Sequence, residues 1–130
     1  MWQNYKIYSI GVDLIEVKRI KSAIEKNPGF IKKIYTDSEV KYCAGKLRSS
    51  FISYAQRFAA KEAVSKSLRT EIGKNIRFNE IEVANLHSGE PVINLYGTTK
   101  AYCDKLTIKD IKITLSSTEE HAVAFAIALI

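Results

Sequence analysis

One stretch, RFAAKEAVSKSL (57–68), limits how this chain can fold. On a helix, at about 100° per residue, its small residues share one broad face made of Ala59, Ala60, Ala63, Val64, Ser67 and Leu68. Small side chains let a neighbouring element approach closely, so this face predicts close packing. The opposite face carries Phe58 beside Glu62 and Lys66, and a phenylalanine is unexpected on a face that should meet water.

The composition is that of an ordinary globular protein. The chain has 130 residues, 46% hydrophobic and 26% charged, which predicts one domain over residues 1–130. No apolar run reaches the roughly 20 residues of a membrane span, and the first ten residues lack the pattern of a signal peptide. We therefore expect a cytoplasmic protein without a membrane partner.

Charge and cysteines narrow the classes of partner. The net charge of +6 would attract an acidic macromolecule or a phosphate-rich ligand. Cys43 and Cys103 have no close cysteine partner and no histidine at metal-ligand spacing, so we expect buried thiols rather than a zinc site or a disulfide.

Periodicity and turn signals predict an α+β fold with a mainly antiparallel sheet packed against helices. The Thr36-Asp-Ser-Glu39 run has the form of a capping box and predicts a helix start at Thr36. Gly89 predicts the turn of a hairpin. The expected strands cover 6–12, 79–86, 91–97, 111–117 and 121–130, and the expected helices begin near Leu14 and cover 36–47, 50–68 and 98–106. The last strand is almost wholly apolar, which predicts burial on both faces or in an assembly.

Glu62 allows two interpretations. It precedes Lys66 by four residues, the favourable order for an ordinary solvated pair on a helix. Phe58, one turn earlier on the same stripe, argues that this face is covered. A covered Glu62 needs a cation or a hydrogen-bond donor, and a metal ion is one candidate.

Asp13 also allows two interpretations. It stands where a strand is expected to give way to a helix, so it can be an N-cap, with Glu16 three residues later. The same place suits an anion or a metal ion, because helix amides point outward there and Gly11 would let a ligand approach the backbone.

GVDLIEVKRI (11–20) and RFAAKEAVSKSL together resemble the two signatures of the holo-acyl-carrier-protein synthase family, which are small 4′-phosphopantetheinyl transferases. Chain length, the spacing between the motifs and the later segments IEVANLHSGEPVINLYG and ITLSSTEEHAVAFAI also fit. The resemblance covers nearly the whole chain, and two motifs in the right order are more specific than either alone.

The resemblance implies an enzyme that transfers the phosphopantetheine arm of coenzyme A to a serine of an apo acyl carrier protein and releases adenosine 3′,5′-bisphosphate. It implies Mg²⁺ as cofactor, with Asp13 as the first metal ligand and Glu62 as the second. Glu62, or a water on the ion, is the candidate base for the serine proton. Lys66 is expected to stabilise charge on the transferring phosphoryl group.

Other positions receive weaker assignments from the resemblance. Arg57 and Lys61 match motif positions and either bind coenzyme A phosphates or remain solvated basic side chains. The family works as a trimer with active sites between subunits, so Phe58 is expected to be covered by a second chain. Arg19 and Lys26 share one face of the first helix and either meet the acidic carrier protein or form an ordinary solvated face.

The chain departs from the family pattern in two places. Arg69 and Glu71 stand where the family has a glycine-rich turn. Ser117, followed by Thr118, stands where the family has a histidine that helps to hold the 3′-phosphate of coenzyme A. These changes leave a weakened or non-catalytic relative as an alternative. A basic module that binds nucleic acid or another polyanion is a further alternative, and the two carboxylates argue against it.

Overall fold

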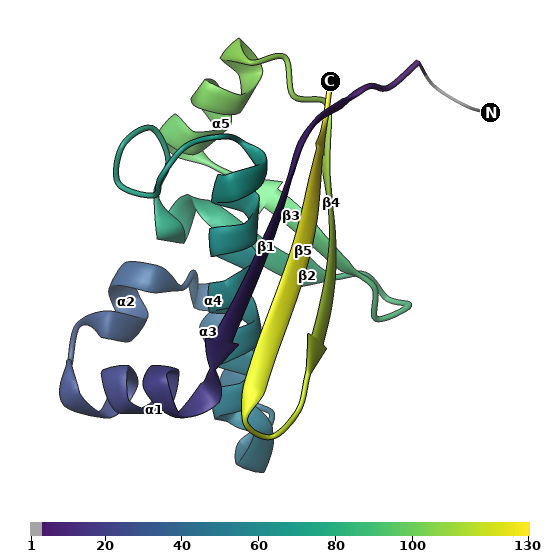
Figure 1. Cartoon of the computed structure of the whole chain (residues 1–130). Helices are drawn as coiled ribbons and strands as arrows, with labels where there is room; N and C mark the ends of the chain where they lie inside the picture. The colour runs from purple at the N-terminus through teal and green to yellow at the C-terminus, as the bar shows by residue number, and fades with distance from the viewer. Residues whose placement is uncertain (1–3) are drawn as a thin grey trace.

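A single long helix, α4 (Ser50–Ser67), lies against one face of a three-stranded sheet (Figure 1). The computed structural model describes residues 4–130, so the signal-peptide prediction lies partly outside the described residues. The other elements are β1 (Ile7–Glu16), α1 (Val17–Lys26), α2 (Phe30–Ile34), α3 (Asp37–Ala44), β2 (Ile81–Asn85), β3 (Pro91–Leu95), α5 (Gly97–Lys105), β4 (Asp110–Ser117) and β5 (His121–Leu129), with short 3₁₀ turns η1 (Leu47–Ser49) and η2 (Phe78–Glu80).

Both sheets are antiparallel. The larger has the order β1-β5-β4, and β2 pairs with β3 in a separate hairpin. The hairpin turns at Gly89, whose φ of 95° suits glycine and whose N–H donates to the Leu86 carbonyl oxygen at 2.8 Å. The predicted α+β class and both predicted hairpins are confirmed.

The small-residue face of α4 packs on an alanine row of β5. Ala122, Ala124, Ala126 and Ala128 are at most 1% exposed, and Ala59, Ala60 and Ala63 of α4 are 0% exposed. The predicted close packing is confirmed. The alternate residues of β5 are only partly buried, so the expectation that this strand is buried on both faces within the chain is wrong.

The start of α1 was predicted too early. β1 continues through Glu16 because its ladder with β5 does not end until Glu16 pairs with His121. Asp13 is therefore a strand residue opposite Ala124 and not an N-cap. Glu16 is the N-cap and makes no side-chain capping hydrogen bond.

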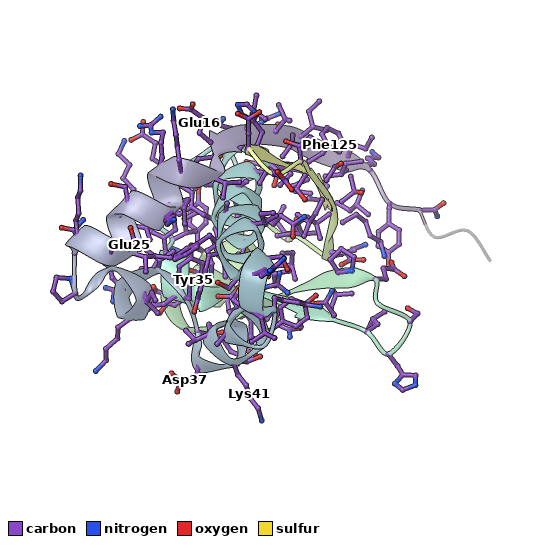
Figure 2. All side chains as sticks on the ribbon, turned by 90° about the horizontal axis from the view of Figure 1, so that it is seen from below. Glu16, Glu25, Tyr35, Asp37, Lys41 and Phe125 are labelled. Atoms are coloured by element: carbon purple, nitrogen blue, oxygen red, sulfur yellow. The ribbon has the colours of Figure 1, made fainter. Side chains whose placement is uncertain are left out.

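The helix α3 begins as predicted. Thr36 Oγ1 accepts from the Glu39 N–H at 3.3 Å, and Glu39 Oε1 accepts from the Thr36 N–H at 3.0 Å, which completes the capping box. Tyr35, just before this box, points toward α4 (Figure 2) and donates its hydroxyl to the Tyr54 carbonyl oxygen at 2.9 Å. These bonds fix α3 on the first half of α4.

No helix among residues 4–130 is both long enough and apolar enough to span a membrane. Cys43 and Cys103 are free thiols buried in the core, as predicted.

Candidate active site

Gly11 brings β1 into contact with α4. A Cβ atom at this position would lie 2.1 Å from the Ala63 carbonyl oxygen, 2.7 Å from Lys66 Cβ and 2.8 Å from the Ser67 nitrogen. Only a residue without a side chain fits there. The expectation that Gly11 opens the backbone to a ligand is wrong, because a helix occupies that space.

This contact places Asp13 beside the last turns of α4. Lys66 donates from Nζ to the Val12 carbonyl oxygen at 2.9 Å and to Asp13 Oδ1 at 3.2 Å. The side chain of Asp13 is 19% exposed and that of Lys66 is 51% exposed. The sequence motifs that carry Asp13 and Lys66 are therefore adjacent in space.

Glu62 lies one turn before Lys66 and shares a cleft with Asp13. Partial burial raises the pKa of Glu62, the negative charge of Asp13 raises it further, and Lys66 acts in the opposite direction. The pair Glu62 and Lys66 is thus not the plain solvated pair of the first interpretation.

The cleft has a volume of ≈ 350 Å³ and carries both carboxylates beside apolar side chains. Arg19 stands among its lining residues, which also include Leu14, Ile15, Ile20, Ala23, Phe30 and Phe58. Two carboxylates facing one space provide hard oxygen ligands that suit Mg²⁺, which binds through one or two carboxylates together with phosphate oxygens and water. Within residues 4–130 no group of three or more His, Cys, Asp or Glu side chains is placed to hold a metal ion.

Phe58 is covered by its own chain. Its ring stacks on Phe30 and Phe78, with ring centroids 6.3 and 5.2 Å away. The short helix α2, which the sequence pattern did not predict, supplies Phe30. Phe58 therefore has partial cover from its own chain, and additional cover by a second chain stays a prediction.

Lys61 is fully buried and cannot reach a ligand. Its Nζ donates to Glu39 Oε1 at 2.7 Å, to the Phe78 carbonyl oxygen at 2.9 Å and to the Ile81 carbonyl oxygen. Glu39 Oε2 accepts from the Val83 N–H at 2.7 Å. Both expectations for Lys61, a coenzyme A contact and a solvated side chain, are corrected because its three donors are used inside the protein.

Arg57 is also buried, at 2% exposure, but without a carboxylate partner among the described residues. Its Nη2 donates to Asn85 Oδ1 at 2.7 Å, and its guanidinium lies 3.9 Å from the centre of the Tyr42 ring. Its Nε has no hydrogen-bond partner among residues 4–130. Arg57 therefore has one unpaired donor among these residues, but that donor is buried; the solvated alternative is wrong, and a contact with coenzyme A stays a prediction.

Ser117 and Thr118 lie at the end of β4, away from Lys66. Ser117 Oγ accepts from Gln56 Nε2 at 2.9 Å, and Gln56 precedes Lys66 by about 15 Å of helix. Thr118 Oγ1 accepts from the His121 N–H at 3.1 Å within the turn. One chain therefore brings Asp13, Glu62 and Lys66 together and leaves Ser117 beside Gln56.

Arg19 and Lys26 lie on α1 as predicted, seven residues apart and both exposed. Sequence reasoning missed that Arg19 also borders the Asp13–Glu62 cleft. It also missed Glu39 as the partner of Lys61. No local signal identifies that pair, because Glu39 already had an explanation as a capping residue.

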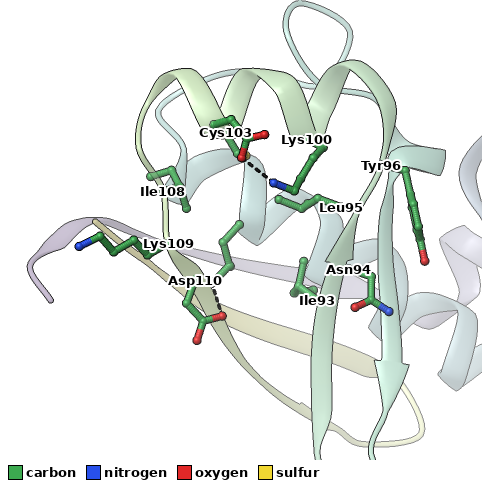
Figure 3. Close-up of a pocket in the computed structure, with 11 residues that line it drawn as sticks. Ile93, Asn94, Leu95, Tyr96, Lys100, Cys103, Ile108, Lys109 and Asp110 are labelled. Atoms are coloured by element: carbon green, nitrogen blue, oxygen red, sulfur yellow. Dashed lines mark hydrogen bonds and ion pairs between the residues drawn. The ribbon is translucent and has the colours of Figure 1, made fainter. Parts of the chain in front are cut away.

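A larger cavity of ≈ 530 Å³ lies between β3, α5 and β4 (Figure 3). It shares no residue with the cleft, and its Lys100 Nζ is 2.5 Å from Asp104 Oδ1 (Figure 3). Both carboxylates of this cavity are paired with a lysine, Asp104 with Lys100 and Asp110 with Lys112. Glu62 has no lysine or arginine within ion-pair distance among the described residues, so we take the Asp13–Glu62 cleft as the candidate active site.

Comparison with known proteins identifies the family of the chain. A sequence model of the 4′-phosphopantetheinyl transferase superfamily matches residues 9–126. The holo-[acyl-carrier-protein] synthase of Ruminiclostridium cellulolyticum is 46% identical over 120 residues, which cover 91% of this chain and 89% of that protein.

Solved structures agree as well. The holo-ACP-synthase of Plasmodium yoelii superposes with a TM-score of 0.86 at 32% identity and 98% coverage of both chains. The Bacillus anthracis holo-(acyl-carrier-protein) synthase in complex with CoA (3′,5′-ADP) gives a TM-score of 0.79 at 33% identity, covering 95% of this chain and 96% of that one. With its fold, its paired carboxylates and relatives of this similarity, the chain belongs to the 4′-phosphopantetheinyl transferase superfamily, which confirms the predicted family and enzyme class.

Proposed function

We propose that this enzyme transfers the 4′-phosphopantetheine arm of coenzyme A to a serine of an apo acyl carrier protein and releases adenosine 3′,5′-bisphosphate. The observation that carries the proposal is the convergence of Asp13, Glu62 and Lys66 from distant parts of the chain on one side of α4. A holo-[acyl-carrier-protein] synthase 46% identical to this chain supports the same assignment.

A divalent cation suits the two carboxylates, and we propose Mg²⁺ held by Asp13 and Glu62. When bound, the ion would neutralise charge on the pyrophosphate of the substrate. Partial burial and the neighbouring Asp13 raise the pKa of Glu62, and a divalent cation held by both carboxylates would favour their ionised forms.

The side chains of this chain would act on the proton and on the phosphate charge. Glu62 is the candidate base for the serine hydroxyl, directly or through a water molecule. Lys66 is already fixed by Val12 and Asp13 and would donate to the transferring phosphoryl group. The family resemblance also assigns Arg57 a contact with an anionic part of coenzyme A, for which this buried side chain would have to move outward.

A homotrimer would complete the site, because Ser117 and Thr118 at the end of β4 lie beside the first half of α4 and away from Lys66 of the same chain. The outward face of the sheet supports assembly: Ile10, Val12 and Leu14 are 54, 52 and 66% exposed. These residues pair with the partly exposed Ile127, Phe125 and Val123 of β5, and Phe125 points away from α4 (Figure 2). An apolar sheet face of this kind suits a second copy of the chain.

The test of assembly is light scattering at micromolar concentration. We expect a trimer, and we expect Ile10→Glu to give a folded monomer with little transferase activity. Lys41→Glu, which changes an exposed residue on α3, is the control and should remain trimeric. A wild-type monomer with full activity would overturn the shared site.

The carrier protein would dock on α1 in the cytoplasm. Arg19 borders the cleft and Lys26 is exposed on the same helix, so both are available to an acidic partner. We expect Arg19→Glu to raise the KM for the carrier protein and to leave the affinity for adenosine 3′,5′-bisphosphate nearly unchanged.

The test of function is incubation with coenzyme A, Mg²⁺ and an apo acyl carrier protein, followed by intact mass. We expect the carrier protein to gain the mass of one phosphopantetheine arm. Asp13→Ala and Glu62→Ala should each abolish transfer while the fold is kept, and Glu62→Gln should be nearly as damaging. No mass gain with wild type would indicate a non-catalytic relative, and near-normal turnover of either alanine variant at saturating metal would refute the two-carboxylate site.

A further inference from the structure

Arg69 has a backbone conformation that is rare for a residue with a side chain. Its φ is 57°, in the left-handed region, and it follows directly on the end of α4. Its N–H donates to the Lys66 carbonyl oxygen at 3.1 Å, which closes the last turn of the helix. A glycine takes this conformation without strain, whereas other residues lose about 1–2 kcal/mol. An arginine here needs a compensating role for its side chain.

Part of that role is structural. Arg69 Nη2 donates to the Tyr8 carbonyl oxygen at 3.0 Å, and the guanidinium lies 4.7 Å from the centre of the Tyr8 ring. Lys66 makes the equivalent bond to Val12, four residues further along β1. The order β1-β5-β4 leaves one edge of β1 without a strand partner, so these two cations cover carbonyl oxygens at that edge.

Most of the guanidinium remains available. An arginine has five N–H donors, and Arg69 uses one of them in the part of the chain that the structure describes. The side chain is exposed and lines a hollow of ≈ 480 Å³ together with Lys66, Lys74, Thr70, Asn75 and Glu71. The hollow is therefore lined by three cationic side chains, those of Lys66, Arg69 and Lys74, and by one carboxylate, that of Glu71.

The hollow adjoins the candidate active site. Lys66 lines it, and the ammonium of Lys66 bonds to Asp13, which lines the carboxylate cleft. A ligand with several phosphates bound at Asp13 and Glu62 would meet Arg69 one helical turn beyond Lys66. Planar guanidinium groups hold phosphate through paired hydrogen bonds, and the bond to the Tyr8 carbonyl oxygen holds this one beside the hollow.

We propose that Arg69 and Lys74 form a phosphate subsite, which takes a phosphate group of the nucleotide substrate beyond the one that Lys66 contacts. This inference rests on the proposed function. It makes Arg69 a specificity-determining residue of this chain.

Isothermal titration calorimetry with coenzyme A, dephospho-coenzyme A and adenosine 3′,5′-bisphosphate tests the proposal. Arg69→Gly is the main variant, because glycine accepts the φ of 57° and so removes the side chain without adding strain. We expect it to bind coenzyme A about tenfold more weakly, the scale of one charge-assisted hydrogen bond. Lys74→Ala should weaken binding in the same direction, and both losses should shrink at high salt.

Arg77→Ala is the matched control. Arg77 is an exposed arginine on the same loop and lines a neighbouring hollow, which shares Lys74 and Asn75 with the hollow of Arg69 but contains neither Arg69 nor Lys66. It should bind as wild type does. The thermal midpoint should not fall in Lys74→Ala or Arg77→Ala, nor in Arg69→Gly, where relief of the strained φ offsets the lost bond to Tyr8. A loss confined to coenzyme A places the 3′-phosphate in the subsite, and an equal loss with dephospho-coenzyme A places the 5′-phosphate there; both outcomes support the proposal.

Two results would overturn it, and they differ from failure of the proposed function. If Arg69→Gly binds coenzyme A as tightly as wild type does, Arg69 only covers the open edge of β1 and binds no phosphate. If Arg69→Gly binds coenzyme A more weakly but also unfolds at a lower thermal midpoint, the weaker binding would reflect lost structure, and Arg69 would again have a structural role only. A wild-type chain that binds none of the three nucleotides would overturn the proposed function and the subsite together.

Discussion

Replacing Gly11 by alanine should separate β1 from α4 and disable the site. The added Cβ would lie 2.1 Å from the Ala63 carbonyl oxygen, whereas ordinary contacts begin at 3.4 Å, so the two elements must move apart by about 1.3 Å. The obstacle is backbone and cannot turn away. Such overpacking costs about 1–3 kcal/mol of unfolding free energy.

The catalytic effect should exceed the loss of stability. Asp13 is two residues beyond Gly11, and Lys66 bonds to both Val12 and Asp13. A displacement of about 1 Å between reacting groups lowers a rate about 100-fold. We therefore expect Gly11→Ala to be folded at 25 °C and to transfer phosphopantetheine about 100-fold more slowly.

Thermal unfolding and the intact-mass assay measure the two effects on the same sample. At about 4 °C per kcal/mol, the midpoint should fall by about 4–12 °C. Gly29→Ala is the control, since a Cβ there meets nothing within 4 Å and φ is −90°. An unchanged midpoint would refute the contact argument, and a lowered midpoint with full activity would refute its link to the site.

Three further variants probe other parts of the chain. Lys61→Met leaves the Glu39 carboxylate buried without its cation and should lower the free energy of unfolding by about 3–5 kcal/mol in urea titrations. The double variant Glu39→Gln/Lys61→Met should recover part of this loss. A loss below about 1 kcal/mol in Lys61→Met would contradict the buried pair. Burial opposes ionisation of Glu82, but hydrogen bonds from Thr36, Tyr96 and Asn94 outweigh it and lower its pKa. The Glu82 carboxylate is therefore protonated at a lower pH in the folded state than in the unfolded state. The stability that the ionised carboxylate contributes at neutral pH is lost as the pH falls below about 4.5 and through the folded pKa. Thermal midpoints measured from pH 6 to 3 should fall less steeply in Glu82→Gln, and parallel curves would contradict the assignment. Ser117→His should tighten coenzyme A binding by about 1 kcal/mol, more so at mildly acidic pH, and leave dephospho-coenzyme A unchanged, whereas equal gains would place the effect away from the 3′-phosphate.

The sequence predicted those parts of the fold that local signals determine. The capping box at Thr36 and the glycine turn at Gly89 act within a few residues, and both formed as expected. The long helix was predicted to within one residue at its end, because its small-residue face persists over several turns.

Long-range partners decided what the sequence did not reveal. β1 extends through Glu16 because of a strand partner at His121, far along the chain, and this moved Asp13 from a helix cap into a strand. The five residues of α2 are too few to show a helical period. Lys61 looked like any basic helix residue until the fold brought Glu39 to it.

For the candidate site, the resemblance selected Asp13, Glu62 and Lys66, and the fold brings these three together. Nothing in the residues around Ser117 predicted its contact with Gln56, because β4 and α4 are distant in sequence. The roles of all these residues stay predictions until the variants are measured.

The carboxylate of Glu39 joins three separate segments, and this affects how the protein opens. Its oxygens accept from the Thr36 N–H, from Lys61 of α4 and from the Val83 N–H of β2. Withdrawal of any one segment would leave a charge in the interior with too few donors, so these segments should open together and not one at a time. In native-state hydrogen exchange, the amides of Thr36 and Val83 should therefore share one opening free energy and respond alike to denaturant.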